Sequence, residues 1–485
     1  MATAAVRLSI AAVAPLFPDE TYFWDWSRHL APGYFDHPPL IAWLIRAGTF
    51  LLGDSVLGVR LGPVAAGVIG TVLVVATARR LAGDRAALVA AVVFAVMPLS
   101  AAGLVLATPD AGLFACIAAV VYCVTRALDC QVGSRSSLAW WSLAGLAQGL
   151  ALCTKYTAVL VPAGLTVALL SRVEWRSRLR EPGPYIGILV AIAVFLPVFV
   201  WNARHGWLSF TFQLQHGLSG SGGSILRHES EFIGSQLGLV SPILFAMMVV
   251  ALWNPGGSDG TTASPLRLLS PVAWLVLGFF MFSATRRRPE ANWPAVAYVP
   301  ATLALVAHAR SRRWDRWLNA GIAVAGTMTL VTYVNTFVPI LPISARRDPV
   351  ARASGWDDLA REVQAVTSSR FIAGNRYQEA SELAFYLPGQ PRTFSLNLGS
   401  RSNQYDFWPS FADRAARGDT LILVTDDLGS GVDPVVSALT PHFIDVGHGR
   451  PVSLARRGDV TKHLRIWTLT DWRGTWPAPL LRSRP

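Results

Sequence analysis

Acidic side chains are concentrated in one short stretch near the N-terminus. Residues 17–40 read FPDETYFWDWSRHLAPGYFDHPPL and directly follow the first apolar segment. The chain has only 30 Asp and Glu among 485 residues, so a cluster here predicts a function. Carboxylates and imidazoles can act as general bases, bind hydroxyl groups or hold a divalent cation. The cluster consists of Asp19, Glu20, Asp25, His29, Asp36 and His37.

Two pairs within this stretch are the most informative. Asp19 and Glu20 are adjacent carboxylates that can serve as a general base, a clamp on hydroxyl groups or part of a metal site. The alternative is a solvated loop in which Asp19 caps the helix that follows. Asp36 and His37 precede two prolines, which stiffen the backbone and end any preceding helix. An ordinary turn is the alternative for this pair.

Two charged residues stand alone between apolar segments farther along the chain. Asp110 follows a proline at the start of a predicted helix, where the helix dipole favours a carboxylate, and capping alone would account for it. Lys155 is one of only two lysines among 42 basic residues. A charge between two membrane helices usually has a function, and a compact ammonium group suits a phosphate. The alternative is a lysine that extends its amine to the membrane interface.

A cluster of charged and polar residues lies near residue 290. Arg286, Arg287 and Arg288 precede Glu290 and Asn292. Guanidinium groups bind phosphate through paired hydrogen bonds, so the triplet predicts an anion site, with lipid-headgroup anchoring as the alternative. His205 lies in a long predicted loop, residues 202–235, where it suits either stacking on a sugar or ordinary packing.

The elements that position these residues are predicted to span a membrane. The chain is 52% hydrophobic and 15% charged, with a mean hydropathy of +0.40, whereas soluble domains carry about 25% charged residues. A spanning helix needs about 20 apolar residues. Residues 38–52 are predicted to form an interfacial helix. The eleven candidate spans are residues 2–17, 59–80, 86–107, 111–128, 138–153, 157–171, 184–201, 236–253, 267–284, 292–309 and 318–340.

The positions of the arginines orient these spans, because cytoplasmic loops are rich in basic residues. If residues 18–58 are outside, the cytoplasmic loops are 81–85, 129–137, 172–183, 254–266 and 310–317. All of these except 254–266 hold arginines within the loop, such as Arg85, Arg176 and Arg313. The acidic stretch, Asp110, Lys155 and the arginine triplet then all fall outside. We therefore predict one active site on the outer face of the cell membrane. The triplet is an exception to the charge rule, which indicates either anion binding or an error of one helix in the count.

The chain changes character after the last span. Residues 343–485 are polar and mixed, with predicted strands at 371–373, 420–425 and 464–469 and a helix at 377–387. This pattern predicts a small α/β domain. The expected organisation is a membrane domain, 1–342, with a first outer loop at 18–58, and an outer domain, 343–485. The fold class is a mainly α polytopic membrane protein with about 11–13 transmembrane helices.

Composition also excludes some classes of protein. The net charge of +12 comes from arginines in loops, which topology explains without nucleic acid. The four cysteines lie in or beside apolar segments, so no disulfide framework is predicted. The N-terminus lacks the basic region of a cleavable signal peptide.

The motifs together resemble the membrane-embedded GT-C glycosyltransferases. The similarity is to the bacterial family 39 and 83 relatives of protein O-mannosyltransferases and of the aminoarabinose transferase that acts on lipid A, and it covers roughly residues 15–300. The resemblance adds Tyr22 and Tyr156 to the candidate substrate-binding residues. The motifs are DETY from Asp19, YFDHPPL from Tyr34, TPD from Thr108, TKY from Thr154 and EANW from Glu290.

The resemblance implies inverting transfer of a sugar from a polyprenyl-phosphate carrier to an outer acceptor, which is a lipid, a glycan or a protein hydroxyl. By position, Asp19 matches the base on the acceptor side, and Glu20 or Asp36 would orient it. Lys155 matches the lysine on the phosphate side, and Asp110 a further acid. No cofactor is required by this scheme, although a divalent cation on Asp19, Asp36 and Asp110 is compatible with it.

Two other functions fit some of these features. A transporter or flippase of lipid-linked sugars would use the same arginines and aromatic residues without catalysis, but it would favour internal repeats and ionisable groups near mid-membrane. A polymerase or ligase that uses a lipid-linked oligosaccharide is the second alternative. The identities of the sugar and the acceptor are not encoded in any motif of the chain.

Overall fold

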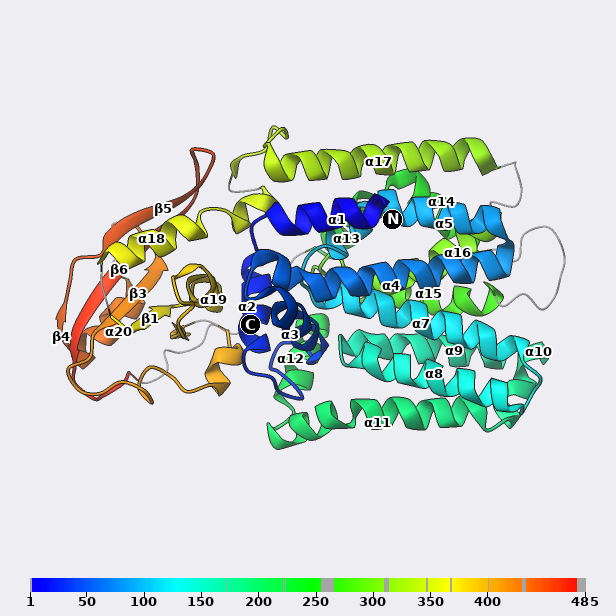
Figure 1. Ribbon diagram of the computed structural model, residues 1–485, viewed down its shortest axis with the longest axis horizontal. Coiled ribbons are helices and arrows are strands. Elements are labelled where there is room, and N and C mark those ends of the chain that lie inside the picture. Colours follow the sequence, from blue (N-terminus) through cyan, green and yellow to red (C-terminus); the bar gives the residue numbers. More distant parts are fainter. Residues whose placement is uncertain are drawn as a thin grey trace. The chain divides into compact units, whose positions relative to one another are not determined.

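The fold is described from a computed structural model (Figure 1). Parts of three predicted loops, residues 172, 254–265 and 310–313, lie outside the described residues. The described residues are 2–171, 173–220, 222, 224–253, 266–308, 314–345, 348–366, 369–399, 401–429 and 433–477.

Contacts divide the chain into two units. The first comprises Met1–Val13 and Leu30–Val334, and the second comprises Ala14–His29 and Asn335–Pro485. The second unit therefore begins eight residues before the expected boundary at residue 343. It also includes the first half of the acidic stretch, which contacts residues more than 350 positions away in the sequence.

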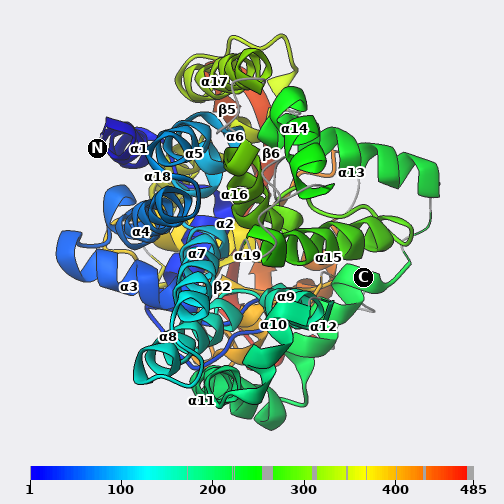
Figure 2. The same ribbon diagram turned by 90° about the vertical axis from the view of Figure 1, so that its right-hand side faces the viewer.

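The first unit is entirely helical in its described residues. Each of the eleven predicted spans coincides with a helix or with a helix interrupted by a break, and Figure 2 views these helices nearly end-on. Its elements are α1 (Ala2–Val13), α3 (Leu40–Leu52), α4 (Val56–Ala82), α5 (Asp84–Val96), α6 (Pro98–Gly103), α7 (Pro109–Asp129), α8 (Arg135–Leu152), η1 (Tyr156–Val159), α9 (Leu160–Ser171), α10 (Val173–Arg176), η2 (Ser177–Arg180), α11 (Gly183–Arg204), α12 (Leu208–Leu218), α13 (Ile225–Val240), α14 (Pro242–Trp253), α15 (Leu266–Ala284), η4 (Trp293–Ala297), α16 (Tyr298–His308) and α17 (Asp315–Phe337).

Five described helices are long and apolar enough to cross a membrane: α4, α7, α11, α15 and α17. The pair α13 and α14 adds a sixth span if it is counted as one, although its axis bends by 102°. Two other predicted spans, 86–107 and 236–253, are divided into shorter helices, because Pro98 and Pro242 each begin a new helix. Along α11, apolar side chains such as Leu189 and Ile192 are exposed, as expected of a helix that faces lipid.

Small residues allow the helices around the site to approach closely. A Cβ atom added to Gly145 of α8 would lie 2.1 Å from the carbonyl oxygen of Gly187 on α11. Such contacts between small residues are a common way to pack membrane helices, because lipid-facing helices gain no hydrophobic energy from association. The predicted helix at residues 38–52 is present as α3, with Phe50 81% exposed and Ile41 and Ile45 buried, and its interfacial position stays a prediction.

The second unit is an α/β domain with a six-stranded mixed sheet of order β2-β1-β3-β6-β4, in which β5 also pairs with β6. Strands β1, β2 and β3 are parallel, and β6 is antiparallel to β3, β4 and β5. The elements are α2 (Pro18–Ser27), η7 (Pro349–Ala353), α18 (Trp356–Val366), β1 (Phe371–Gly374), α19 (Tyr377–Tyr386), β2 (Phe394–Ser395), η8 (Gln404–Phe407), β3 (Leu421–Asp426), α20 (Pro434–Leu439), η9 (Thr440–His442), β4 (Phe443–Val446), β5 (Arg450–Arg456) and β6 (Asp459–Trp472).

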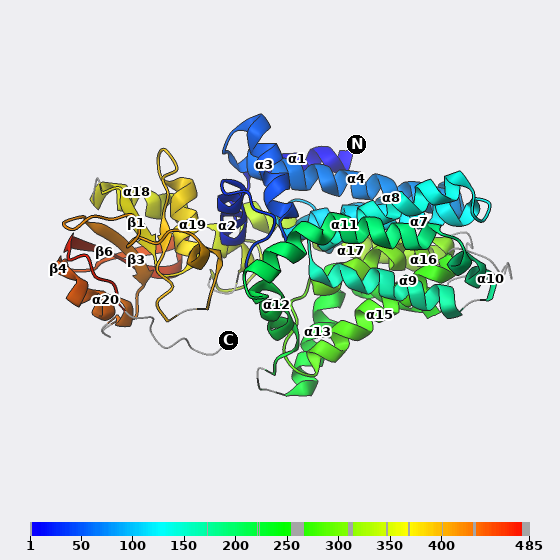
Figure 3. The same cartoon turned by 90° about the horizontal axis from the view of Figure 1, so that it is seen from below.

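Alternating side chains on the strands fill the two faces of this sheet. Ile422 packs with the buried residues of α18 and α19, whereas Leu423 packs with those of α20 and Phe443. Figure 3 shows the helices on the two sides of the strands. The predicted strands and the predicted helix of this region are confirmed at β1, β3, β6 and α19.

Candidate functional site

A buried ion pair forms the polar centre of the first unit. Lys155 Nζ donates to Asp110 Oδ1 at 2.5 Å, and Asn292 Nδ2 donates to Asp110 Oδ2 at 2.7 Å. Asp110 and Lys155 are only 8% and 9% exposed. Asp110 follows the proline that begins α7, as predicted, and so reaches both partners from a helix start. The ammonium group has three donors, of which Asp110 uses one, so Lys155 can still donate to a bound anion.

Lys155 opens on a large cavity. The cavity has a volume of about 510 Å³, and most of its lining is apolar or aromatic, from η1, α11, α12, α15 and η4. Its few polar groups include Lys155, Tyr156, His37 and Gln213. A single ammonium group at the wall of an apolar cavity suits a molecule with an anionic head and a hydrocarbon tail.

The loop that contains Asp36 and His37 is attached beside Lys155. The backbone N–H of Leu40 donates to the carbonyl oxygen of Cys153 at 2.9 Å, which holds the start of α3 against the turn before Lys155. Asp36 is 6% exposed, and its carbonyl oxygen accepts a hydrogen bond from Gln213 Nε2. His37 thus lines the same cavity as Lys155, and Asp36 is buried directly before it.

A helix replaces part of the predicted loop 202–235 and supplies residues that sequence reasoning missed. Helix α12 presents Phe210, Gln213, Leu214 and Gly217 to the cavity. These positions are separated by three, four and seven residues, which is the spacing of one helical face. This periodicity was the signal that could have identified them.

The predicted residues Tyr156 and His205 have different surroundings. Tyr156 lines the cavity, and its hydroxyl lies 2.9 Å from Ser209 Oγ and accepts from Asn202 Nδ2 at 3.2 Å. His205 does not line this cavity. Its ring stacks on Trp201 with the centroids 4.0 Å apart, and its Nδ1 lies 2.7 Å from the Trp201 carbonyl oxygen.

The structure separates the three arginines of the triplet. Arg288 Nε lies 3.2 Å from Glu231 Oε2, and the Arg286 guanidinium lies 5.2 Å from the centre of the Phe282 ring. Arg287 Nη1 donates to the carbonyl oxygen of Gln215 at 3.3 Å. Its Nε is buried and has no hydrogen-bond partner among the described residues.

Arg287 is therefore the member of the triplet best placed to bind an anion. Burial lowers the pKa of its guanidinium, an effect that the nearby carboxylate of Glu290 partly offsets. A bound anion would both satisfy Nε and restore a charge partner.

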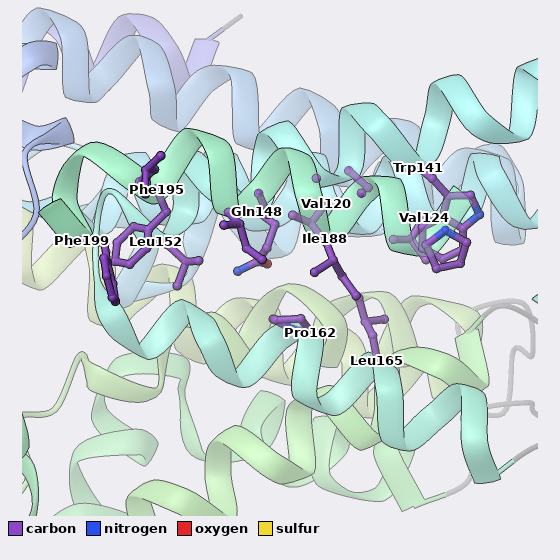
Figure 4. A pocket seen from close by; sticks show the side chains of 17 residues that line it. Val120, Val124, Trp141, Gln148, Leu152, Pro162, Leu165, Ile188, Phe195 and Phe199 are labelled. Atoms are coloured by element: carbon purple, nitrogen blue, oxygen red, sulfur yellow. The ribbon is translucent and has the colours of Figure 1, made fainter. Parts of the chain in front are cut away.

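A second apolar cavity adjoins the first. It has a volume of about 480 Å³ and is lined by α7, α8, α9 and α11 (Figure 4). Leu152 and Phe195 line both cavities. Gln148 contributes a polar group to the lining: its Nε2 donates to the carbonyl oxygen of Ala158, while its buried Oε1 has no partner among the described residues. The two cavities together offer an extended apolar surface that begins at Lys155.

The carboxylates at the start of α2 lie in the second unit. Asp19 is exposed, and its Oδ1 accepts a hydrogen bond from the Tyr377 hydroxyl at 3.0 Å. Glu20 is fully buried, and its Oε2 accepts from the backbone N–H of Phe17 at 3.0 Å, so it caps α2. Tyr22 is buried, and its hydroxyl accepts from the N–H of Gln404. Asp19 is thus the one of these three side chains that is exposed to solvent.

A buried acid beneath these residues was missed by sequence reasoning. Glu382 lies on α19 and is fully buried. Burial raises its pKa well above the ordinary value of 4.5, and the nearby Glu20 raises it further. The residue sits in an ordinary helical pattern, and nothing local in the sequence indicates that it faces α2.

Glu382→Gln is expected to stabilise the second unit at neutral pH. The Glu382 carboxyl group binds its proton more tightly in the folded protein than in the unfolded chain. This difference adds to the free energy of unfolding in full below pH 4.5, and the added stability is lost as the pH rises toward the pKa of the folded state. Glutamine does not titrate, so the variant does not lose stability in this way as the pH rises. We expect its melting temperature to exceed that of the wild type by about 2 °C or more at pH 8. Thermal unfolding of the full chain in detergent from pH 5 to 8 measures the difference.

Glu362→Gln, at a partly exposed position of α18, is the control and should show no such pH-dependent gain. Equal pH dependence of the wild type and Glu382→Gln would show that Glu382 is ionised in the folded protein.

The candidate metal ligands fall in different units. Asp36 and Asp110 belong to the first unit and Asp19 to the second. Within the described part of the chain, no group of three or more His, Cys, Asp or Glu residues is arranged to hold a metal ion.

Comparison with known proteins extends the evidence from the fold and the site. Residues 36–201 match the family described as dolichyl-phosphate-mannose-protein mannosyltransferase. The lipid A galacturonosyltransferase RgtD of Rhizobium johnstonii is 30% identical over 359 residues, which are 73% of each chain. An undecaprenyl phosphate-α-4-amino-4-deoxy-L-arabinose arabinosyl transferase of Pseudomonas aeruginosa is 32% identical over 179 residues, 36% of this chain and 32% of that protein.

The crystal structure of ArnT from Cupriavidus metallidurans in the apo state has a similar fold. The TM-score is 0.65, with 18% sequence identity and 96% of each chain covered. The fold is therefore that of the GT-C membrane glycosyltransferases. The chain belongs to the family of polyprenyl-phosphate-dependent glycosyltransferases that includes the lipid A galacturonosyltransferase. It is a multi-pass membrane enzyme that transfers a sugar from a polyprenyl-phosphate carrier to an acceptor.

Proposed function

We propose that this enzyme transfers one sugar, with inversion, to a saccharide-bearing lipid on the outer face of the cell membrane. The observation that carries the proposal is the buried Lys155 on the wall of a large apolar cavity. A lipid-linked sugar has the matching chemistry, because a phosphate joins its hydrocarbon tail to its sugar.

The donor is proposed to lie with its phosphate at Lys155 and the first part of its tail in the cavity. Asp110 and Asn292 position the ammonium group, and Arg287 supplies a second cation. The adjoining cavity, reached past Leu152 and Phe195, extends the apolar surface for the rest of the tail. The phosphate becomes the leaving group, so cations that stabilise its charge also lower the barrier to reaction.

The proposed reaction is a single displacement. An acceptor oxygen attacks the anomeric carbon, the bond from that carbon to the phosphate oxygen breaks, and polyprenyl phosphate leaves with the electron pair. Asp19 accepts the proton of the acceptor group as general base. Asp36 and His37 are proposed to orient the sugar, and Glu290 and Tyr156 to contact it. One attack with one base inverts the anomeric centre.

The proposed acceptor is a lipid of the lipid A type. The relative whose alignment covers 73% of this chain is named a lipid A galacturonosyltransferase. The outer orientation is supported by the arginine-rich loops on the opposite side of the predicted spans. The flippase alternative would need neither a base nor a leaving-group site.

The test is a transfer assay with the full chain in nanodiscs. Polyprenyl phosphates carrying galacturonic acid or 4-amino-4-deoxy-L-arabinose would be supplied with lipid A, and the products identified by mass spectrometry. A lipid A product with one added sugar and an inverted anomeric centre is expected from one of the donors. Retention of configuration, or transfer to protein but not to lipid A, would contradict the proposal.

A further inference from the structure

The second unit contains a separate polar pocket. Its volume is about 220 Å³, and η7, α18, the starts of α2 and α19, and strands β5 and β6 line it. The other lysine of the chain, Lys462, contributes to this pocket, just as Lys155 does to the donor cavity. The transfer reaction described above leaves this pocket without a role.

An ion-paired lysine lines the pocket. Lys462 Nζ donates to Glu379 Oε1 at 2.6 Å and forms an ion pair with Asp426 Oδ1 at 3.0 Å. It lies 5.6 Å from the centre of the Trp356 ring. Burial alone would lower the pKa of Lys462, but the two carboxylates together raise it above its ordinary value. The lysine therefore remains charged at neutral pH and ties α19 to β3 and β6.

Two arginines on the rim leave donors for a ligand. Arg352 is exposed, and Arg376 is 51% exposed and contacts Asp426 Oδ2 at 2.5 Å. A guanidinium has five N–H donors, so this contact leaves most of those on Arg376 unused. Gln378 adds a buried Oε1 that has no hydrogen-bond partner among the described residues. The pocket thus combines a cationic rim with an unused acceptor.

The neighbours of the pocket relate it to the proposed base. Pro18, which lines the pocket, directly precedes Asp19. Tyr377, which donates to Asp19, lies between Arg376 and Gln378 in the sequence. Arg376 on the rim and the carboxylate of Asp19 therefore lie at the starts of α19 and α2, two helices that the Tyr377–Asp19 hydrogen bond connects.

We propose that this pocket binds an anionic saccharide headgroup of the acceptor, with its phosphate or carboxylate on Arg352 and Arg376 and a sugar hydroxyl on Gln378. Arginine suits the anion because its fork of donors matches two oxygens, and Gln378 Oε1 accepts from a hydroxyl. This inference rests on the proposed function, because it assigns to the acceptor a site beside the base.

The test measures binding without turnover. Full-length protein in phosphatidylcholine nanodiscs is titrated with glucose 1-phosphate, inorganic phosphate and glucose by isothermal calorimetry. We expect glucose 1-phosphate to bind best, and the Arg352→Gln/Arg376→Gln double variant to bind it at least about tenfold more weakly. Lys462 is left in place, because its removal would leave the buried Glu379 without its cation. Arg361→Gln, an exposed arginine of α18, is the matched control and should bind normally.

A Lys155→Gln/Asp110→Asn variant, which removes both charges of the buried pair, separates this pocket from the donor site. Binding that persists in this variant supports the proposal, whereas binding lost there belongs to the donor phosphate site and overturns it. Unchanged affinity in the double variant also overturns it, as does binding of inorganic phosphate that equals that of glucose 1-phosphate. None of these results depends on sugar transfer, so failure here is distinguishable from failure of the proposed function.

Discussion

Asp19→Asn is expected to lower turnover by about 10²- to 10⁴-fold, the usual contribution of a general base. The amide cannot take the acceptor proton, but its oxygen can still accept the hydrogen bond from Tyr377. The second unit should therefore keep its fold, and donor binding should be unchanged. Single-turnover transfer measured beside donor affinity would show this separation.

Asp445→Asn provides a control for this change. Asp445 is an exposed carboxylate on β4 in the same unit, so its replacement removes the same charge. Near wild-type turnover is expected for this variant. Wild-type turnover in Asp19→Asn would instead remove Asp19 from the proposed mechanism and direct attention to Asp36.

Replacing Lys155 is expected to weaken donor binding by about 10- to 100-fold, because a hydrogen bond to a charged group contributes about 1.5–3 kcal/mol. Lys155→Ala alone would leave Asp110 buried without its cation, which usually destabilises a protein. The informative variant is therefore Lys155→Gln combined with Asp110→Asn, which removes both charges and keeps polar groups in place. Binding of undecaprenyl phosphate to nanodisc-embedded protein measures the effect.

The arginine triplet offers a matched control for the donor site. Arg288 is ion-paired with Glu231 and largely exposed, so Arg288→Gln should bind the donor normally. Arg287→Gln should weaken binding, because the buried Nε of Arg287 has no hydrogen-bond partner among the described residues. Equal donor affinity in the wild type and the Lys155→Gln/Asp110→Asn variant would refute the phosphate role of Lys155.

Sequence reasoning selected residues that were conspicuous against their surroundings. Lys155 was identified because lysine is rare in this chain and charge is costly between apolar helices. The structure adds two contacts between residues far apart in the sequence: Asp110 accepts hydrogen bonds from both Lys155 and Asn292. The helices were predicted from long apolar segments. The interruptions within some predicted spans were not, because they depend on prolines and on packing, which hydropathy does not describe.

Sequence reasoning was weakest where the chain folds back over long distances. Glu20 and Asp19 looked equivalent, yet one is a buried cap and the other is exposed. The difference arises because α2 packs against α19, and no local pattern predicts a partner 360 residues away. The same contact explains why Glu382 was missed: its burial depends on α2 and not on the pattern of its own helix.

The pairing of α2 with α19 also constrains the order in which the molecule is completed. Residues 18–27 are synthesised before the helices from α3 to α17, and their partners in α19 are made only after all of these helices. Until then, Trp24 and Trp26, both fully buried in the finished protein, lack the surface that covers them. A truncated chain that ends after α17 would keep Lys155 and its cavity but leave Asp19 without Tyr377. The enzyme is thus organised so that its proposed base is set in place only when synthesis has reached the last third of the chain.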